Sequence, residues 1–130
     1  MNNPELILLV DDDEINNFIN ETILEGIFPN SNIISFVNPI KALHFIVTDY
    51  IEKPLPAVIF LDINMPQMSG WELLDKLEQY HETIISNIYF FILSSSVAPS
   101  DKTKSTDNPL VKDFVSKPLS KKLIQNLLQT

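Results

Sequence analysis

Residues 57–72 read AVIFLDINMPQMSGWE, and this stretch decides the fold of the chain. The apolar run 57–61 has no polar alternation, which is typical of a strand buried on both faces. Asp62 follows the run directly. Ser69 and Glu72 have capping-box spacing, which predicts a helix that begins after Ser69. The stretch is therefore predicted to be a buried strand, a short connection that starts at Asp62, and a helix.

The same alternation of apolar runs and helical patterns extends along the chain and indicates an α/β fold with a parallel sheet. The predicted strands are 6–10, 33–36, 57–61, 88–93 and 114–115. Asn38-Pro39 offers an N-cap followed by proline at the first helical position. The apolar stripes at helical spacing are Ile15, Phe18, Ile19, Ile23 and Ile27; Ile40, Leu43 and Val47; Leu73, Leu74 and Leu77; and Leu119, Leu123 and Leu127. Residues 99–108 are almost wholly polar, and we expect a short helix there that is mobile or completed by a partner.

Length and composition indicate one globular domain, residues 1–130. The net charge is −8 and the chain has no arginine, which argues against direct binding of nucleic acid. The absence of cysteine excludes disulfides and zinc–thiolate sites and suits a reducing compartment. The N-terminal residues resemble no signal peptide, and the longest apolar run, 88–93, is too short to span a bilayer. We expect a cytoplasmic protein without membrane insertion.

Polar side chains follow most of the predicted strands. Asp11 and Asp12 come after the first strand, Asp62 after the third, Ser94 after the fourth, and Lys117 shortly after the fifth. In open α/β sheets, ligands bind outside the carboxyl ends of the strands. The second strand ends without a reactive side chain and belongs at the margin. This predicts a flavodoxin-like, doubly wound, five-stranded parallel sheet of order 2-1-3-4-5, with helices on both faces.

Three converging carboxylates repel one another and need a cation. Oxygen ligands without histidine or cysteine suit Mg²⁺, which keeps waters that a phosphate oxygen can displace. Lys117 adds a compact positive charge and Ser94 a hydroxyl donor. These residue types suit phosphoryl transfer to a carboxylate, with Asp62 as the nucleophile and Mg²⁺ and Lys117 neutralising the phosphoryl oxygens.

The motifs that carry these residues resemble those of the response regulator receiver domain. They are Val10-Asp11-Asp12, the stretch Leu61 to Gly70, Leu93-Ser94-Ser95, and Lys117-Pro118, and in this order they cover essentially the whole chain. The resemblance implies that Asp62 is the phosphoacceptor, that Asp12 binds Mg²⁺ directly and that Asp11 binds it through water.

The resemblance also assigns roles to the remaining site residues. Asn64 would bind the metal through its backbone carbonyl, and Ser94 and Lys117 would contact the phosphoryl group. The Lys117-Pro118 peptide would be cis. Phe114, three residues before the lysine, would be the aromatic partner of Ser94 in the switch, although phenylalanine in place of the commoner tyrosine lacks the phenolic hydrogen bond.

The function that this resemblance implies is a phosphorylation-dependent switch in a two-component phosphorelay, rather than an enzyme. A histidine kinase or phosphotransfer protein would supply the phosphoryl group. With no residues left for an output domain, an unidentified downstream protein would receive the signal, and the docking face would be 99–108, Phe114 and the last helix.

Two other functions stay open. One is a binding module of the same fold that works without phosphate. The other is a Mg²⁺-dependent phosphohydrolase resembling the haloacid dehalogenases, which carry a second aspartate two positions after the nucleophile. This chain has Asn64 at that position.

Overall fold

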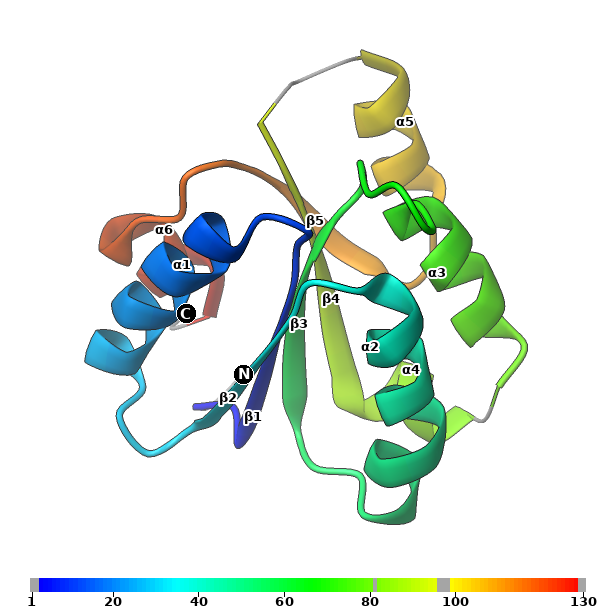
Figure 1. The fold of residues 1–130 in the computed structure, drawn as a ribbon, viewed down its shortest axis with the longest axis horizontal. Helices are drawn as coiled ribbons and strands as arrows, with labels where there is room; N and C mark the ends of the chain where they lie inside the picture. Colours follow the sequence, from blue (N-terminus) through cyan, green and yellow to red (C-terminus); the bar gives the residue numbers. More distant parts are fainter. Residues whose placement is uncertain (1–2, 81, 96–98, 129–130) are drawn as a thin grey trace.

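The computed structural model of the chain describes residues 3–80, 82–95 and 99–128, and its centre is one parallel sheet (Figure 1). The sheet has the order β2-β1-β3-β4-β5, which confirms the predicted topology. Its strands are β1 (Leu6–Val10), β2 (Asn32–Phe36), β3 (Ala57–Asp62), β4 (Ile88–Ser94) and β5 (Val111–Ser116). The fifth strand is longer than its two-residue apolar run indicated, because three of its residues are exposed and polar.

Helices cover both faces of the sheet. Figure 1 shows α1 (Glu14–Ile27) and α6 (Lys121–Leu128) on one face, and α2 (Pro39–Phe45), α3 (Gly70–Glu78) and α5 (Pro99–Asp107) on the other. A π-helical turn, η1 (Ile46–Tyr50), continues α2, and α4 (Glu82–Asn87) precedes β4. The predicted stripe reached Val47 in η1, but the π-helical form of this turn and the helix α4 were not expected from the sequence. None of the helices in the described part of the chain has the length and hydropathy to cross a membrane.

Alternate residues of the central strands divide the core into two clusters. Leu8, Ile59 and Ile92 pack under α2 and α3, whereas Leu9, Phe60 and Phe91 pack under α1 and α6. Every residue of β1 and β3 is buried, as expected for parallel strands with helices on both sides. The sheet is therefore a rigid base for groups at the carboxyl ends of these strands.

The predicted helix starts are confirmed. The hydroxyl of Ser69 accepts a hydrogen bond from the backbone N–H of Glu72 (3.1 Å), and the Glu72 carboxylate accepts one from the N–H of Ser69 (3.5 Å). This is a complete capping box at the start of α3. At the start of α2, the side chain of Asn38 accepts a hydrogen bond from the backbone N–H of Ile40, and Pro39 lies in the first turn.

The buried face of α1 differs from the face that its apolar stripe indicated. Ile15 and Phe18 are each 70% exposed, whereas Asn17, Asn20 and Leu24 are buried. The stripe correctly predicted a helix, but amide side chains occupy the turn that contacts the sheet. The result is an apolar surface on the outside of α1.

Candidate functional site

The carboxyl ends of β1 and β3 bring the predicted acidic residues together. Val10 pairs with Leu61 in the parallel register, so Asp11 and Asp62 follow side by side. Carboxylate oxygens of Asp11, Asp12 and Asp62 all lie within 4.8 Å of one another. Asp11 and Asp62 are buried, and Asp12 is exposed at the rim.

Lys117 reaches this cluster from the loop after β5. Its Nζ lies 2.7 Å from Oδ2 of Asp11 and 3.6 Å from Oδ2 of Asp62. The peptide between Lys117 and Pro118 is cis, as the resemblance implied. The side chain of Lys117 is only 13% exposed, so its ammonium lies inside the cluster rather than on the surface.

The pKa values of these groups reflect burial and close charges. Burial raises the pKa of Asp62 from 3.8 to about 6, although Lys117 and the hydrogen bond from Asn64 act in the opposite direction. Burial alone would lower the pKa of Lys117, but the hydrogen bond to Asp11 and the charge of Asp62 outweigh it, so the pKa is raised. Lys117 therefore remains an ammonium at neutral pH.

The β3–α3 connection begins at Asp62. The backbone N–H of Asn64 donates a hydrogen bond to Oδ1 of Asp62 (3.3 Å), while the Asn64 side chain is exposed. Met65 and Met68 are buried in the core and anchor the connection. The backbone of Asn64 is thus at the site, and its side chain lies toward solvent.

Ser94 and Phe114 lie on the two strands beyond β3. Ser94 is fully buried at the end of β4, one residue past the Leu93 that pairs with Asp62. Its carbonyl accepts a hydrogen bond from the N–H of Lys117 (2.8 Å), which fixes the lysine loop to β4. Phe114 is half-buried on β5, pairs with Ile92 and packs against the core under α2 and α3.

Asn17 supports the site and was not identified from the sequence. Its amide donates hydrogen bonds to the carbonyl oxygens of Asp11 (2.9 Å) and Phe36 (3.3 Å), so it joins the ends of β1 and β2. Asp13 caps α1 by accepting from the N–H groups of Ile15 and Asn16. The sequence did contain a signal. Asn17 precedes Asn20 by three residues and Leu24 by seven, and this spacing places all three on one helix face.

Gly70 is the second residue that sequence reasoning missed. A Cβ at this position would lie 2.6 Å from the carbonyl oxygen of Asp62 and 2.9 Å from the Cα of Ile63. The Gly70 N–H also donates to the carbonyl of Ile63 (3.1 Å). The first turn of α3 therefore lies directly against the backbone that carries Asp62.

Gly70→Ala is expected to lower the free energy of unfolding by about 1–3 kcal/mol, since backbone atoms cannot rotate away from the new methyl group. Urea denaturation measures the change. Gly26→Ala is the matched control, because nothing lies within 4 Å of the position that its methyl group would occupy and alanine favours a helix by about 0.5–1 kcal/mol. Equal effects at the two glycines would contradict the close approach described here.

The donor set fits a hard divalent cation. All the ligand atoms are oxygens, and the charges of three carboxylates exceed the single charge of Lys117. Asp11, Asp12 and Asp62, with the backbone carbonyl of Asn64, are the residues that could hold Mg²⁺. The same edge presents a carboxylate nucleophile, an ammonium and a buried hydroxyl, which is the set of groups that phosphoryl transfer to an acid requires.

Comparisons with known proteins agree with this geometry. The family model described as response regulator receiver domain matches residues 7–129. The structure of a two-component response regulator from Cytophaga hutchinsonii is 35% identical, with a TM-score of 0.87 over 95% of this chain and 93% of that chain. A response regulator receiver protein from Dyadobacter fermentans has a TM-score of 0.79 over 94% of this chain and 96% of that chain, and at 24% identity it shows the fold alone.

A curated relative also matches. The stress response regulator protein 1 of Scheffersomyces stipitis is 38% identical over 72 residues, which is 55% of this chain and 23% of that protein. The chain spans between 23% and 54% of the length of the curated relatives it matches.

Proposed function

Because this chain belongs to the response regulator receiver domain family, a family of signalling domains, we propose that it is a phosphorylation-dependent switch of a two-component phosphorelay. In this proposal Asp62 accepts the phosphoryl group, and the chain assists both its own phosphorylation and its dephosphorylation. The change from a carboxylate to an acyl phosphate of roughly −2 charge is the signal.

The observation that carries the proposal is the position of Asp62 between the acidic pair and Lys117. Its carboxylate is 3.6 Å from the ammonium and within 4.8 Å of ligand atoms of Asp11 and Asp12. The ammonium of Lys117 partly offsets the repulsion between the Asp62 carboxylate and its acidic neighbours. The close packing of Gly70 holds the backbone of Asp62 in place. Positioning and charge neutralisation are the main catalytic requirements of phosphoryl transfer.

The chemistry proposed for the chain is an in-line displacement. An oxygen of Asp62 forms a bond to phosphorus while the bond from phosphorus to a histidine nitrogen of the donor breaks, and that nitrogen keeps the electron pair. Lys117 neutralises charge on the transferred oxygens, and the Ser94 hydroxyl donates to one of them. Mg²⁺, when bound by the acidic residues and the Asn64 carbonyl, supplies further positive charge at the same oxygens.

The apolar surface on α1 supports a protein as the phosphoryl donor. Exposed apolar side chains lie on α1 and on the adjoining β2–α2 region: Ile15, Phe18, Ile19, Val37 and Ile40. A groove of about 560 Å³ is lined by Ile15 and Val37 together with Asp12, so this surface is continuous with the rim of the acidic cluster. We propose that a histidine kinase or phosphotransfer protein docks here and presents its phosphohistidine to Asp62.

The remaining proposals concern the response. Phosphorylation would draw Ser94 toward the phosphoryl oxygens and let the ring of Phe114 turn inward, which would alter the face made by α5, β5 and α6. A separate downstream protein would read that face in the cytoplasm. The half-buried position of Phe114 against the core is compatible with such a rotation.

The test is intact-mass spectrometry after treatment with acetyl phosphate, with and without Mg²⁺. We expect a mass increase of one phosphoryl group that requires Mg²⁺. If no increase appears, and beryllofluoride with Mg²⁺ leaves the amide NMR spectrum unchanged, the chain is a phosphate-independent binding module instead. Continued turnover of small phosphate esters would instead indicate a phosphohydrolase.

A further inference from the structure

Helix α5 offers few apolar side chains for packing against the rest of the molecule. Its nine residues include no large apolar side chain, and Ser105 is its buried residue. Among the residues that the structure describes, a hydrogen bond and a cation–π contact join it to α3, both at one indole. Nε1 of Trp71 donates to Oδ1 of Asp101 (3.3 Å), and Nζ of Lys104 lies 6.0 Å from the centroid of the Trp71 ring. Since few side chains fill the space between the helices, a groove remains there.

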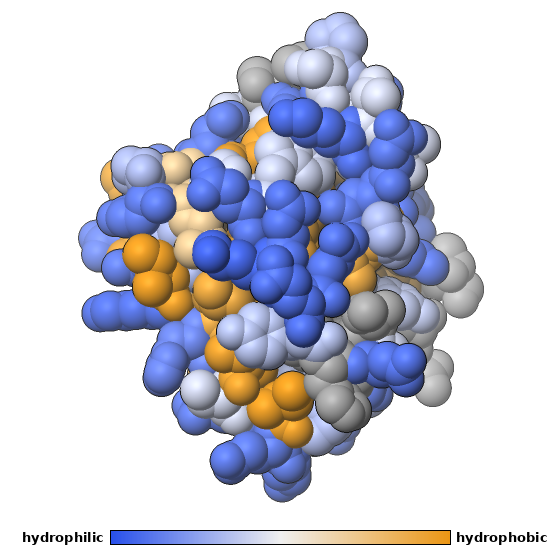
Figure 2. Space-filling view, turned by 90° about the vertical axis from the view of Figure 1, so that its right-hand side faces the viewer, coloured by the Kyte–Doolittle hydropathy of each residue, from blue (hydrophilic) through white to orange (hydrophobic). Residues whose placement is uncertain are grey.

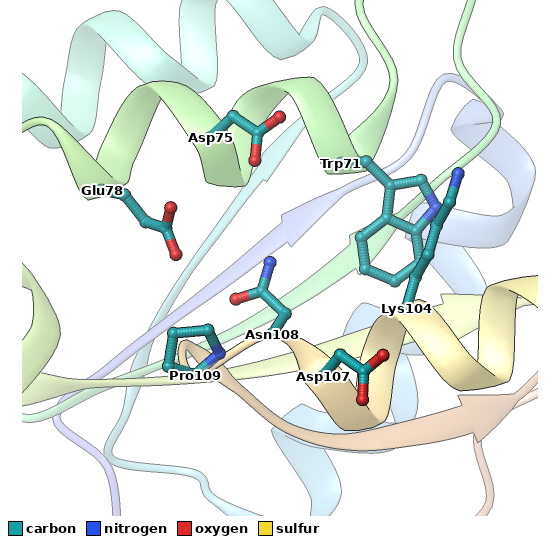
Figure 3. Close-up of a pocket in the computed structure, with 7 residues that line it drawn as sticks. All are labelled: Trp71, Asp75, Glu78, Lys104, Asp107, Asn108 and Pro109. Carbon is teal, nitrogen blue, oxygen red and sulfur yellow. The ribbon is translucent and has the colours of Figure 1, made fainter.

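This groove has a volume of about 420 Å³ and is lined from both helices. Figure 3 shows Asp75 and Glu78 on the α3 side and Lys104 and Asp107 on the α5 side, with the indole of Trp71 at one end. The indole is half-buried and packs against the core, so it is a fixed wall rather than a mobile side chain.

The charges of the groove favour a cation. The carboxylates of Asp75, Glu78 and Asp107 line the groove with a single ammonium, that of Lys104. In the part of the chain that the structure describes, both ion pairs are made by Lys117, so none of these three carboxylates forms one. Lys104 already lies against the indole, so the chain itself shows where a cation fits. Figure 2 shows that hydrophilic residues predominate on the upper part of the face that carries α3 and α5.

We propose that the groove between α3 and α5 binds an arginine side chain of a partner protein. A planar guanidinium can stack on the indole of Trp71 while it donates to the carboxylates of Asp75 or Glu78. Lys104 competes for the same place and must move aside, which its exposed position permits. The proposal goes beyond the phosphorylation switch and does not rest on it, because every group involved is present in the unphosphorylated chain.

The single tryptophan of the chain makes the test direct, because fluorescence excited at the red edge of the absorption band, where tyrosine does not absorb, reports on Trp71 alone. The probe is the peptide acetyl-Gly-Arg-Gly-Arg-Gly-amide, titrated into the unphosphorylated full chain. The control peptide has citrulline in place of arginine, which keeps the shape and removes the charge. We expect a saturable change with the arginine peptide and none with the citrulline peptide. Equal responses, or no saturable response to arginine, would overturn the proposal.

Three variant proteins separate the groove from general charge attraction, with affinity measured by calorimetry. Asp75→Asn combined with Glu78→Gln should weaken binding by about fivefold, since each exposed ion pair contributes a factor of roughly two to five. Lys104→Gln should strengthen binding severalfold because the competing ammonium is gone. Lys102→Gln removes the same charge from the exposed surface of α5 and should match the wild type. Equal gains in the two lysine variants would mean that net charge, not the groove, attracts the peptide. All the substituted side chains are exposed, and circular dichroism verifies that the variants fold.

Discussion

Lys117→Met is expected to lower the free energy of unfolding of the metal-free chain by about 2–4 kcal/mol at pH 7. Removing one partner of a buried ion pair typically costs about 3–5 kcal/mol, because the remaining charge stays buried without compensation. The cost should be somewhat smaller here, since Asp12 at the rim is exposed and water reaches part of the cluster. Urea denaturation in the presence of a chelator measures the change.

Magnesium distinguishes this effect from a simple packing defect. Without Lys117 the cluster has a larger net negative charge, so the variant should bind Mg²⁺ more tightly and recover part of its stability when Mg²⁺ is added. Lys53→Met is the matched control, because Lys53 is exposed and precedes the start of β3, whereas Asp62 lies at the opposite end of that strand, and it should leave stability and Mg²⁺ affinity unchanged. A Lys117→Met chain as stable as the wild type without metal would contradict the ion pairs of 2.7 and 3.6 Å.

Asp62→Asn is expected to stabilise the metal-free chain at pH 7 by about 2–3 kcal/mol, from a shift of about two pKa units at 1.36 kcal/mol each. The folded chain has a pKa of about 6 at Asp62, against 3.8 as the ordinary value. Between these pH values the folded state binds more protons than the unfolded state, so wild-type stability falls as the pH rises through this window. The loss is complete above pH 6, and asparagine avoids it because it carries no charge.

The pH dependence is the sharper part of this prediction. The difference between Asp62→Asn and the wild type should be nearly full at pH 7, shrink as the pH falls through the range from about 6 to 3.8, and vanish only below that range. Asp49→Asn, at an exposed aspartate in η1, is the control and should show no such gap. Thermal unfolding of the three proteins across this pH range provides the measurement. If the stability of Asp62→Asn relative to the wild type instead increased on acidification, Asp62 would be stabilised as a carboxylate, which is opposite to what its burial implies.

Much of the architecture could be predicted because the parallel strands are continuous apolar runs. The strand order followed from one further observation, that polar side chains come after four of the runs and not after the second. The helix caps could also be predicted from the sequence, because each involves residues close together in the chain. These are Ser69 with Glu72 and Asn38 with Pro39. Capping depends on local hydrogen bonds, so it needs no knowledge of the tertiary structure.

The parts that sequence did not reveal depend on contacts between distant segments. The apolar residues of α1 gave the right helix, but Ile15 and Phe18 in its first half are exposed, because Asn17 turns inward to bind the carbonyl groups of Asp11 and Phe36. The role of Gly70 depends on how closely α3 approaches β3, which no local pattern specifies. Helix α5 was expected to lack an apolar anchor, and its contact with Trp71 became visible only when α3 and α5 were placed together.

The candidate site was predicted from the strand ends, and the structure brings Asp11, Asp12, Asp62 and Lys117 together. The roles of these four residues stay predictions, as do those of Asn64, Ser94 and Phe114. They concern a bound metal, a transferred phosphoryl group and a rotation of the ring, which the resting geometry of the chain alone does not test.

The most direct test of the central claim is to locate the phosphoryl group. Borohydride reduction of the acetyl phosphate-treated chain converts an aspartyl phosphate to homoserine, and tandem mass spectrometry identifies its position. The account predicts homoserine at position 62, dependent on Mg²⁺, and no homoserine in Asp62→Asn. Homoserine at position 11 or 12 with residue 62 intact, or undiminished labelling of Asp62→Asn, would contradict it.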